Sequence, residues 1–315
     1  AALDWMRMSV AVCVTGMPER LQPEHLIKRF VAPNAARFAF DIIYALAPPT
    51  SLFYSTDGHV KYDPSSFAQQ THAQLTQSLA KLVSGFPERH VRLHVLRAIN
   101  DLDAAALRKK LSISPVQALD RISQFIGNIQ PRILNMYHHQ EICAQQIGEI
   151  ERGRGRVFDF VVSTREDVYL WKDMNLEELT SRHTCDIVTK DCKNWGGINM
   201  RLQLLRRDSG LRFLRDRLPF YAAMYRENRT FANPEVFELA QAEALKLSVC
   251  YRSIDNVPVT AVRHTQHGEF CFPKFEVFNI AGEGSCMPKD HAQFTMRSFC
   301  NEVQAAMLAL QRGSS

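Results

Sequence analysis

The sequence feature that most limits the fold is a continuous apolar run from Ser9 to Val14, which ends at Thr15-Gly16. An unbroken run of this kind, closed by a turn, is typical of a strand buried on both faces, as strands of parallel sheets are. A second such run, Phe158 to Val162, passes directly into polar residues. We therefore expect the two runs to be buried neighbours in one mainly parallel sheet, with Gly16 and Asp167 at the same edge.

Strand and helix patterns alternate through the first half of the chain and are mixed in the second half. Further strands are predicted at Ala39–Ala47, Ser51–Tyr54, Val91–Leu96, Cys185–Thr189, Met200–Leu205, Ser248–Ile254 and Val257–Val262. Helices are predicted at Pro23–Phe30, Phe67–Val83, Leu102–Leu111, Pro115–Ile126, Pro131–Glu151, Ser209–Tyr225 and Pro234–Leu247, and an amphipathic segment at Asp290–Leu310. Neither a repeat nor a linker interrupts the 315 residues. The pattern predicts one α/β domain with a mainly parallel central sheet flanked by helices.

Composition narrows the class of protein. Apolar residues make up 46% of the chain and charged residues 23%, which is ordinary for a soluble globular protein. No apolar run reaches the roughly 18 residues that span a bilayer. The net charge is +5, and the basic residues fall in scattered clusters rather than in the patch that nucleic-acid binding requires. These clusters suit a phosphate-bearing ligand as well as a solvated surface.

The eight cysteines include no CxxC pair, which argues against a zinc ribbon. Their even number permits disulfides in a secretory lumen, and buried free thiols fit the sequence equally well. The compartment therefore stays open between the Golgi lumen, with an upstream anchor removed, and the cytoplasm.

Three charged residues, Arg165, Glu166 and Asp167, directly follow the second buried run. In open α/β sheets ligands bind at the carboxyl ends of the strands. Two adjacent carboxylates beside a guanidinium suit a site for Mg²⁺ or Mn²⁺ with a diphosphate, since hard cations prefer oxygen ligands and are often shared with phosphates. Arg165 would then orient a carboxylate or contact phosphate. The alternative interpretation is a turn at the strand end with a local ion pair.

Four segments resemble, in the same order, an uncharacterised family of glycosyltransferase-like proteins from plants, algae and microbes. Phe158 to Tyr169 is similar to the stretch of that family that ends in R-x-D-x-Y, and Val10 to Arg20 is similar to its opening strand and turn. Trp195 to Asn199 resembles its G-G-L-N segment, and Asn233 to Glu235 resembles its N-S-E segment. Two departures stand out: Ser163 replaces an arginine of the pattern, and Glu166-Asp167 is not a DxD.

The resemblance implies a GT-A-like, Rossmann-like fold and a glycosyltransferase that takes a nucleotide-sugar donor, with a UDP-sugar as the favoured form, and a glycan or other hydroxyl acceptor. Residues 1–130 would form the nucleotide-binding half, and residues 131–315 the metal and acceptor half. Thr15, Gly16 and Arg20 would line the nucleotide pocket, and Gly196 and Gly197 would form a loop that lets the backbone approach the sugar.

The same resemblance implies a Mn²⁺ or Mg²⁺ ion at Asp167, with Glu166 beside it. GT-A enzymes often add a late histidine to the metal, for which His264 and His267 are the candidates. Glu235 would act as general base if the reaction inverts the sugar, and Asp191 is a second candidate catalytic carboxylate.

Each of these residues also has a structural interpretation. Gly16 and the Gly196-Gly197 pair would serve as turn glycines, Glu235 as a first-turn carboxylate favoured by the helix dipole, and the histidines as ordinary surface residues. Two other classes of protein stay open as well. A glycoside hydrolase would also use paired carboxylates, although the sequence has no GxSxG, HExxH or P-loop motif. An inactive carbohydrate- or nucleotide-binding protein would keep the same core.

Overall fold

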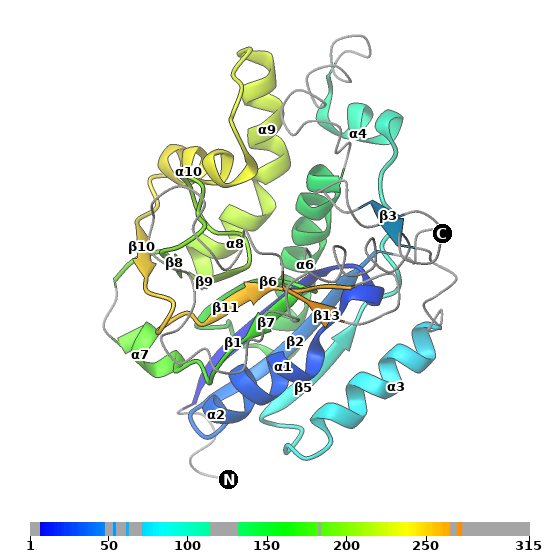
Figure 1. Cartoon of the computed structure of the whole chain (residues 1–315), viewed down its shortest axis with the longest axis vertical. Helices are drawn as coiled ribbons and strands as arrows, with labels where there is room; N and C mark the ends of the chain where they lie inside the picture. The colour runs from blue at the N-terminus through cyan, green and yellow to red at the C-terminus, as the bar shows by residue number, and fades with distance from the viewer. Residues whose placement is uncertain are drawn as a thin grey trace, which may run out of the picture.

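The computed structural model describes residues 7–47, 53–54, 61–62, 71–113, 132–181, 184–264 and 270–272, and it has a mixed α/β architecture (Figure 1). The predicted segments Pro115–Ile126 and Asp290–Leu310 lie outside the described residues, as do residues 67–70 of the helix predicted to begin at Phe67. No helix among the described residues is long and apolar enough to cross a membrane.

A seven-stranded sheet forms the centre of the described structure, in the order β10-β8-β9-β6-β1-β2-β5. Its strands are β1 (Met8–Gly16), β2 (Phe38–Leu46), β5 (Val91–Val95), β6 (Phe160–Arg165), β8 (Ile187–Lys190), β9 (Leu202–Arg206) and β10 (Val249–Arg252). All of them run in one direction except β9, which pairs antiparallel with both β6 and β8. The predicted α/β class, with a mainly parallel central sheet flanked by helices, is confirmed.

Strand β1 lies inside this sheet because both of its faces are apolar. Val10, Val12 and Val14 point into one hydrophobic core, while Ala11 and Cys13 point into the core on the other face. Full burial of a valine side chain contributes about 1.5–3 kcal/mol to stability. As predicted, β1 pairs in parallel with β6 on one side, and it pairs with β2 on the other.

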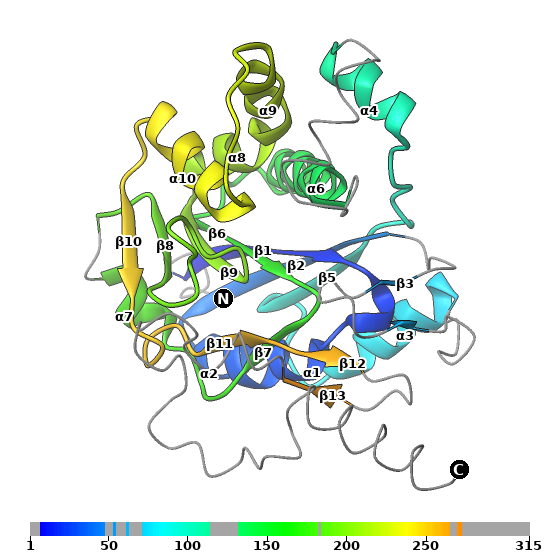
Figure 2. The same cartoon turned by 45° about the horizontal axis from the view of Figure 1, so that its top comes forward.

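Helices cover both faces of the sheet (Figure 2). One face carries α6 (Arg132–Arg154), α8 (Arg207–Arg215), α9 (Arg217–Arg226) and α10 (Pro234–Ala244), and α4 (Ala104–Leu111) lies on the same side. The opposite face carries α1 (Pro23–Leu26), α2 (Ala32–Asn34), α3 (His72–Val83) and α7 (Leu176–Ser181). Two short turns of other helix types complete the first crossover, at Pro18–Arg20 and Ile27–Val31.

Several of the predicted helices differ in detail. The helix predicted at Pro23–Phe30 is α-helical only to Leu26 and continues as the π-helical turn Ile27–Val31. The long helix was expected to end at the glycines near residue 153, yet α6 runs through Gly153 to Arg154 and ends at Gly155, whose φ of +65° is left-handed. The helix predicted at Ser209–Tyr225 is two helices, because the backbone leaves helical geometry at Asp216.

Three two-stranded pairs complete the described strands. They are β7 (Val168–Leu170) with β11 (Val259–Ala261), β12 (Arg263–His264) with β13 (Phe270–Cys271), and β3 (Phe53–Tyr54) with β4 (Lys61–Tyr62). The first pair matters for the site, because β7 begins directly after Asp167, whose carbonyl accepts a hydrogen bond from Val262 N at 2.9 Å.

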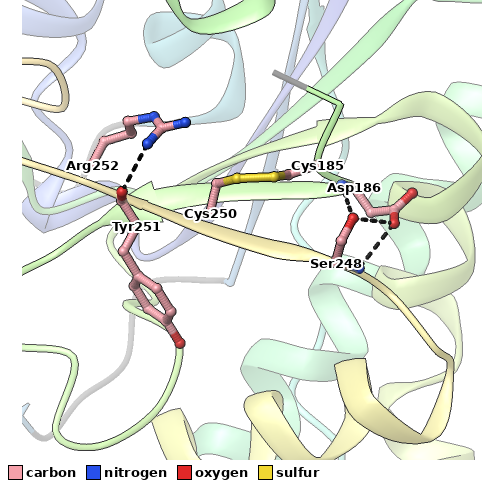
Figure 3. The surroundings of a disulfide bond; sticks show 6 residues. All are labelled: Cys185, Asp186, Ser248, Cys250, Tyr251 and Arg252. Carbon is pink, nitrogen blue, oxygen red and sulfur yellow. Dashed lines mark hydrogen bonds between the residues drawn. A yellow bond between two sulfur atoms is a disulfide. The ribbon is translucent and has the colours of Figure 1, made fainter. Parts of the chain in front are cut away.

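Disulfides tie the sheet to a helix and link two of its neighbouring strands. Cys13 of β1 is bonded to Cys143 of α6, and Cys185, just before β8, is bonded to Cys250 of β10 (Figure 3). Next to the second bond, Asp186 accepts hydrogen bonds from the backbone and hydroxyl of Ser248. No described cysteine is a free thiol. Of the two states that the composition permitted, the structure therefore has the disulfide-bonded one.

Candidate functional site

The sheet reverses its strand order at the boundary between β1 and β6. From β1 the chain adds β2 and β5 on one side, and it then returns to place β6 on the other side of β1. Ligands of open α/β sheets bind at such a switch point, beyond the carboxyl ends of the strands. Thr15 and Arg165 are register partners at that end, so the residues that follow each of them meet at the switch point.

The backbone at position 16, where β1 ends, has room only for a glycine. Its φ is +136°, a region that side chains rarely adopt, and a Cβ atom built on it would overlap the Glu166 carboxylate. Glu166 N donates to Thr15 O at 3.0 Å, which continues the ladder one residue beyond the two strands. The predicted proximity of Gly16 and Asp167 at one edge of the sheet is confirmed, since Asp167 follows Glu166 in the chain.

Asp167 is surrounded by guanidinium groups, and its own side chain has 0% exposure. Arg20 forms an ion pair with it from the turn after β1. Arg165 Nη2 lies 3.2 Å from Asp167 Oδ2, and Arg201 Nη1 lies 3.2 Å from each carboxylate oxygen. Glu166 is also buried, 3.4 Å from Arg20 Nη1. We refer to Arg20, Arg165, Glu166, Asp167 and Arg201 as the Asp167 cluster.

Burial lowers the pKa of Arg165, and the neighbouring arginines act in the same direction, whereas Asp167 and Glu166 raise it. An arginine stays protonated in a protein regardless of such shifts. The Arg165 side chain retains 21% of its surface, more than Arg20 with 14% or Arg201 with 11%. The exposed surface of the cluster is therefore shared among its three arginine side chains, with the largest share on the side chain of Arg165.

The loop between β8 and β9, residues 191–201, links this cluster to the glycine segment. Arg201, at its end, contacts Asp167, while Gly196 and Gly197 lie near its middle. A Cβ atom on Gly197 would overlap the backbone carbonyl of Glu235, and Ile198 N donates to Glu235 O at 3.0 Å. Gly197 is thus needed for the close approach of two chain segments.

Glu235 stands in the first turn of α10, which Asn233 caps by accepting a hydrogen bond from Val236 N at 2.8 Å. The Glu235 side chain is half-buried. Asp191 is exposed at the end of β8, where its backbone N–H donates to Arg252 O. Tyr251 connects this region to the glycines, because its hydroxyl donates to Gly197 O at 3.2 Å. Burial raises the pKa of Tyr251, and the charge of Asp191 adds to the shift.

The structure describes little of the two histidine candidates. The backbone of His264 belongs to β12, where it pairs with Phe270. Its side chain and all of His267 lie outside the described residues. In the part of the chain that the structure describes, no group of three or more His, Cys, Asp or Glu side chains converges as a complete metal cage would.

The Asp167 cluster offers two carboxylates for an ion that is shared with a ligand, although such an ion would have to displace guanidinium groups from the oxygens of Asp167. Its two carboxylates supply the hard oxygen atoms that Mg²⁺ and Mn²⁺ prefer, and a shared ion needs only one or two protein carboxylates, the rest coming from phosphate and water.

Sequence reasoning missed two features of this region. Arg201 was not singled out, because nothing in the local sequence distinguishes it from other loop arginines. Arg217 and Glu238 form an ion pair at 3.2 Å with both side chains fully buried, and each also contacts Gln203 of β9. Burial raises the pKa of Glu238, while Arg217 and Gln203 act to lower it. This pair joins α9, α10 and β9, and it thereby fixes the helix that carries Glu235.

No model of a known protein family matches the sequence, and no curated protein matches it significantly. Among solved structures, the apo form of mouse xyloside xylosyltransferase 1 is similar with a TM-score of 0.39 and 9% identity, over 79% of this chain and 85% of that one. The apo structure of WbbM, a bifunctional glycosyltransferase, is similar with a TM-score of 0.40 and 10% identity, over 79% of this chain. The match covers 39% of the WbbM chain.

Proposed function

We propose that this protein is a GT-A-like glycosyltransferase, which moves a sugar from a nucleotide-sugar donor to a hydroxyl group of a glycan or other acceptor. One observation carries the proposal. The four segments that resemble the glycosyltransferase-like family are far apart in the sequence, yet they are linked by contacts along one edge of the sheet. Gly16 and Arg20 meet Glu166 and Asp167, and the loop that holds Gly197 supplies Arg201 to Asp167. The same glycine packs against the fourth segment at Glu235.

The donor would bind at the switch point. Its nucleotide would lie against the Thr15-Gly16 turn, and its diphosphate would accept hydrogen bonds from Arg165 and its neighbours. Guanidinium groups suit this role, because their planar N–H donors match the geometry of phosphate oxygens. As the sugar transfers, negative charge accumulates on the leaving diphosphate, and fixed cations stabilise that charge in the transition state.

A Mn²⁺ or Mg²⁺ ion belongs to the proposal as an ion shared with the donor. Asp167 would be its first protein ligand, Glu166 its neighbour, and His264 the candidate from β12. When bound, such an ion supplies Lewis-acid stabilisation of the diphosphate oxygens. The arginines of the cluster stabilise the same charge, so we expect chelation to weaken activity more than it weakens nucleotide binding.

The acceptor would approach from the side of the Gly197 loop. If the reaction inverts the sugar, Glu235 takes the proton of the acceptor hydroxyl. The acceptor oxygen then bonds to the anomeric carbon, and the bond from that carbon to the diphosphate breaks. Asp191 is the second carboxylate proposed for this side. The division into a nucleotide half and a metal and acceptor half stays part of the proposal, although Arg165 and Arg201 of the second half would share in binding the donor.

A screen of nucleotide sugars tests the proposal. Ligands that bind the native state raise the melting temperature by mass action. We expect UDP-sugars to stabilise the protein, with and without Mn²⁺, and to release UDP when a hydroxyl acceptor is added. Binding without release of nucleotide would favour the inactive binding protein. Hydrolysis of a simple glycoside without any nucleotide would favour the glycoside hydrolase.

A further inference from the structure

Large apolar side chains are rarely exposed in the described part of this protein. Three are, namely Met8, Val157 and Trp195. Met8 begins β1 and Val157 precedes β6, so both lie at the amino ends of parallel strands, away from the switch point. Trp195 retains 47% of its surface and lies at the carboxyl edge, in the loop between β8 and β9. Single exposed apolar residues are common, so the case for Trp195 depends on how it is held and on what surrounds it.

The backbone of Trp195 is held in an unfavourable conformation. Its φ of +51° is left-handed, a genuine outlier for a bulky side chain. Such conformations persist only when the surrounding structure imposes them, and they concentrate at functional sites. Here Asn233 Nδ2 donates to Trp195 O at 3.0 Å, and Gly197 N donates to Asn194 O at 2.8 Å, so that the loop is fastened to the start of α10. The indole is therefore presented on a fixed support.

The neighbours of Trp195 belong to the two halves of the proposed reaction. Its loop ends at Arg201, which contacts Asp167, and Gly197 of the same loop packs against Glu235. Lys193, which is itself buried, places its ammonium 5.6 Å from the centre of the indole ring. The ammonium thus lies over one face of the indole, within the loop that connects the donor cluster to the candidate base.

We propose that Trp195 is the platform on which a pyranose ring of the acceptor stacks, on the indole face that the Lys193 ammonium does not cover. A pyranose has one face rich in C–H bonds, which matches the electron-rich face of an indole, while its hydroxyl groups point outward to polar partners. This inference rests on the proposed function, since it identifies the acceptor as a pyranoside that binds beside Glu235.

The test uses wild type, Trp195→Ala, Trp195→Phe and the control Val157→Ala, which removes an exposed apolar side chain at the opposite edge. Methyl glycosides of glucose, galactose, mannose and xylose, in both anomeric forms, are titrated by saturation-transfer NMR. The Kd of UDP is measured on the same samples by calorimetry. We expect wild type to bind at least one glycoside and Trp195→Ala to bind it about tenfold more weakly, as for the loss of an aromatic contact. Trp195→Phe and Val157→Ala should stay close to wild type, and the Kd of UDP should change less than twofold throughout.

The inference is overturned if wild type binds none of these glycosides, or if Trp195→Ala binds the glycoside as tightly as wild type does. Either result leaves the proposed donor site standing as long as UDP binds. If UDP fails to bind while the glycoside binds through Trp195, the proposed function fails and the platform is that of a carbohydrate-binding protein.

Discussion

Asp167→Asn is the substitution whose effect follows most directly from the contacts in the site. It preserves the size of the side chain but removes the negative charge that faces Arg20, Arg165 and Arg201. Removing one partner of a buried ion pair costs about 3–5 kcal/mol, because the remaining charge stays in a poorly solvated place. The side chains of these three arginines retain 14%, 21% and 11% of their surface. We therefore expect a loss near the lower limit, about 3 kcal/mol in the free energy of unfolding.

The matched control is Asp173→Asn. Asp173 pairs with Arg29 at 2.9 Å, but its side chain is 58% exposed. Surface pairs of this kind contribute at most about 1 kcal/mol. Urea unfolding followed by circular dichroism measures both variants, and a shift of the midpoint at constant slope reports the change in stability. If Asp167→Asn and Asp173→Asn lose the same small amount of stability, Asp167 is not the buried centre of the Asp167 cluster.

Two further substitutions test the surroundings of the site. Gly197→Ala should lower the free energy of unfolding by about 1–3 kcal/mol and impair transfer, because the added Cβ overlaps the Glu235 carbonyl. Gly153→Ala is the control: no atom lies within 4 Å of its Cβ, so it should be neutral or slightly stabilising. Equal unfolding midpoints for the two variants would refute the steric argument. Replacing both Cys185 and Cys250 by alanine should cost about 4 kcal/mol, since that disulfide closes a loop over 65 residues; an unfolding midpoint equal to that of wild type would contradict the bond.

The parts of the fold that could be predicted from the sequence are those where several consecutive residues carry the same pattern. The runs at Ser9–Val14 and Phe158–Val162 are apolar at nearly every position, and only a strand buried on both faces satisfies all of them. Because each run ends in a polar turn and parallel strands end at one edge, the meeting of Gly16 with Glu166-Asp167 followed as well. The break between α8 and α9 was missed although Pro219 signals it, because a proline lacks the N–H that a continuous helix needs and clashes with the carbonyl four residues earlier, at Arg215, where α8 ends.

The partners of Asp167 were only partly predictable, because some of them are distant in the sequence. Arg165 is adjacent in sequence and Arg20 follows the glycine turn, but Arg201 reaches Asp167 across 34 residues from a loop without periodicity. The disulfides Cys13–Cys143 and Cys185–Cys250 were equally hidden, since eight cysteines allow about a hundred pairings and spacing does not choose among them. Contacts of this kind depend on the register of distant strands, which no short segment encodes.

Calorimetric titration of UDP and GDP, each compared with its own nucleoside, tests the proposed diphosphate site most directly. Wild type and Arg165→Gln are titrated with Mn²⁺ and with chelator, and Arg29→Gln serves as a control that removes a surface arginine. A charge-assisted hydrogen bond contributes about 1.5–3 kcal/mol. We therefore predict that one diphosphate binds wild type at least tenfold more tightly than its nucleoside, and that Arg165→Gln, but not Arg29→Gln, removes most of this difference. Equal affinity for diphosphate and nucleoside, or an unchanged Kd in Arg165→Gln, would contradict a donor site at the Asp167 cluster.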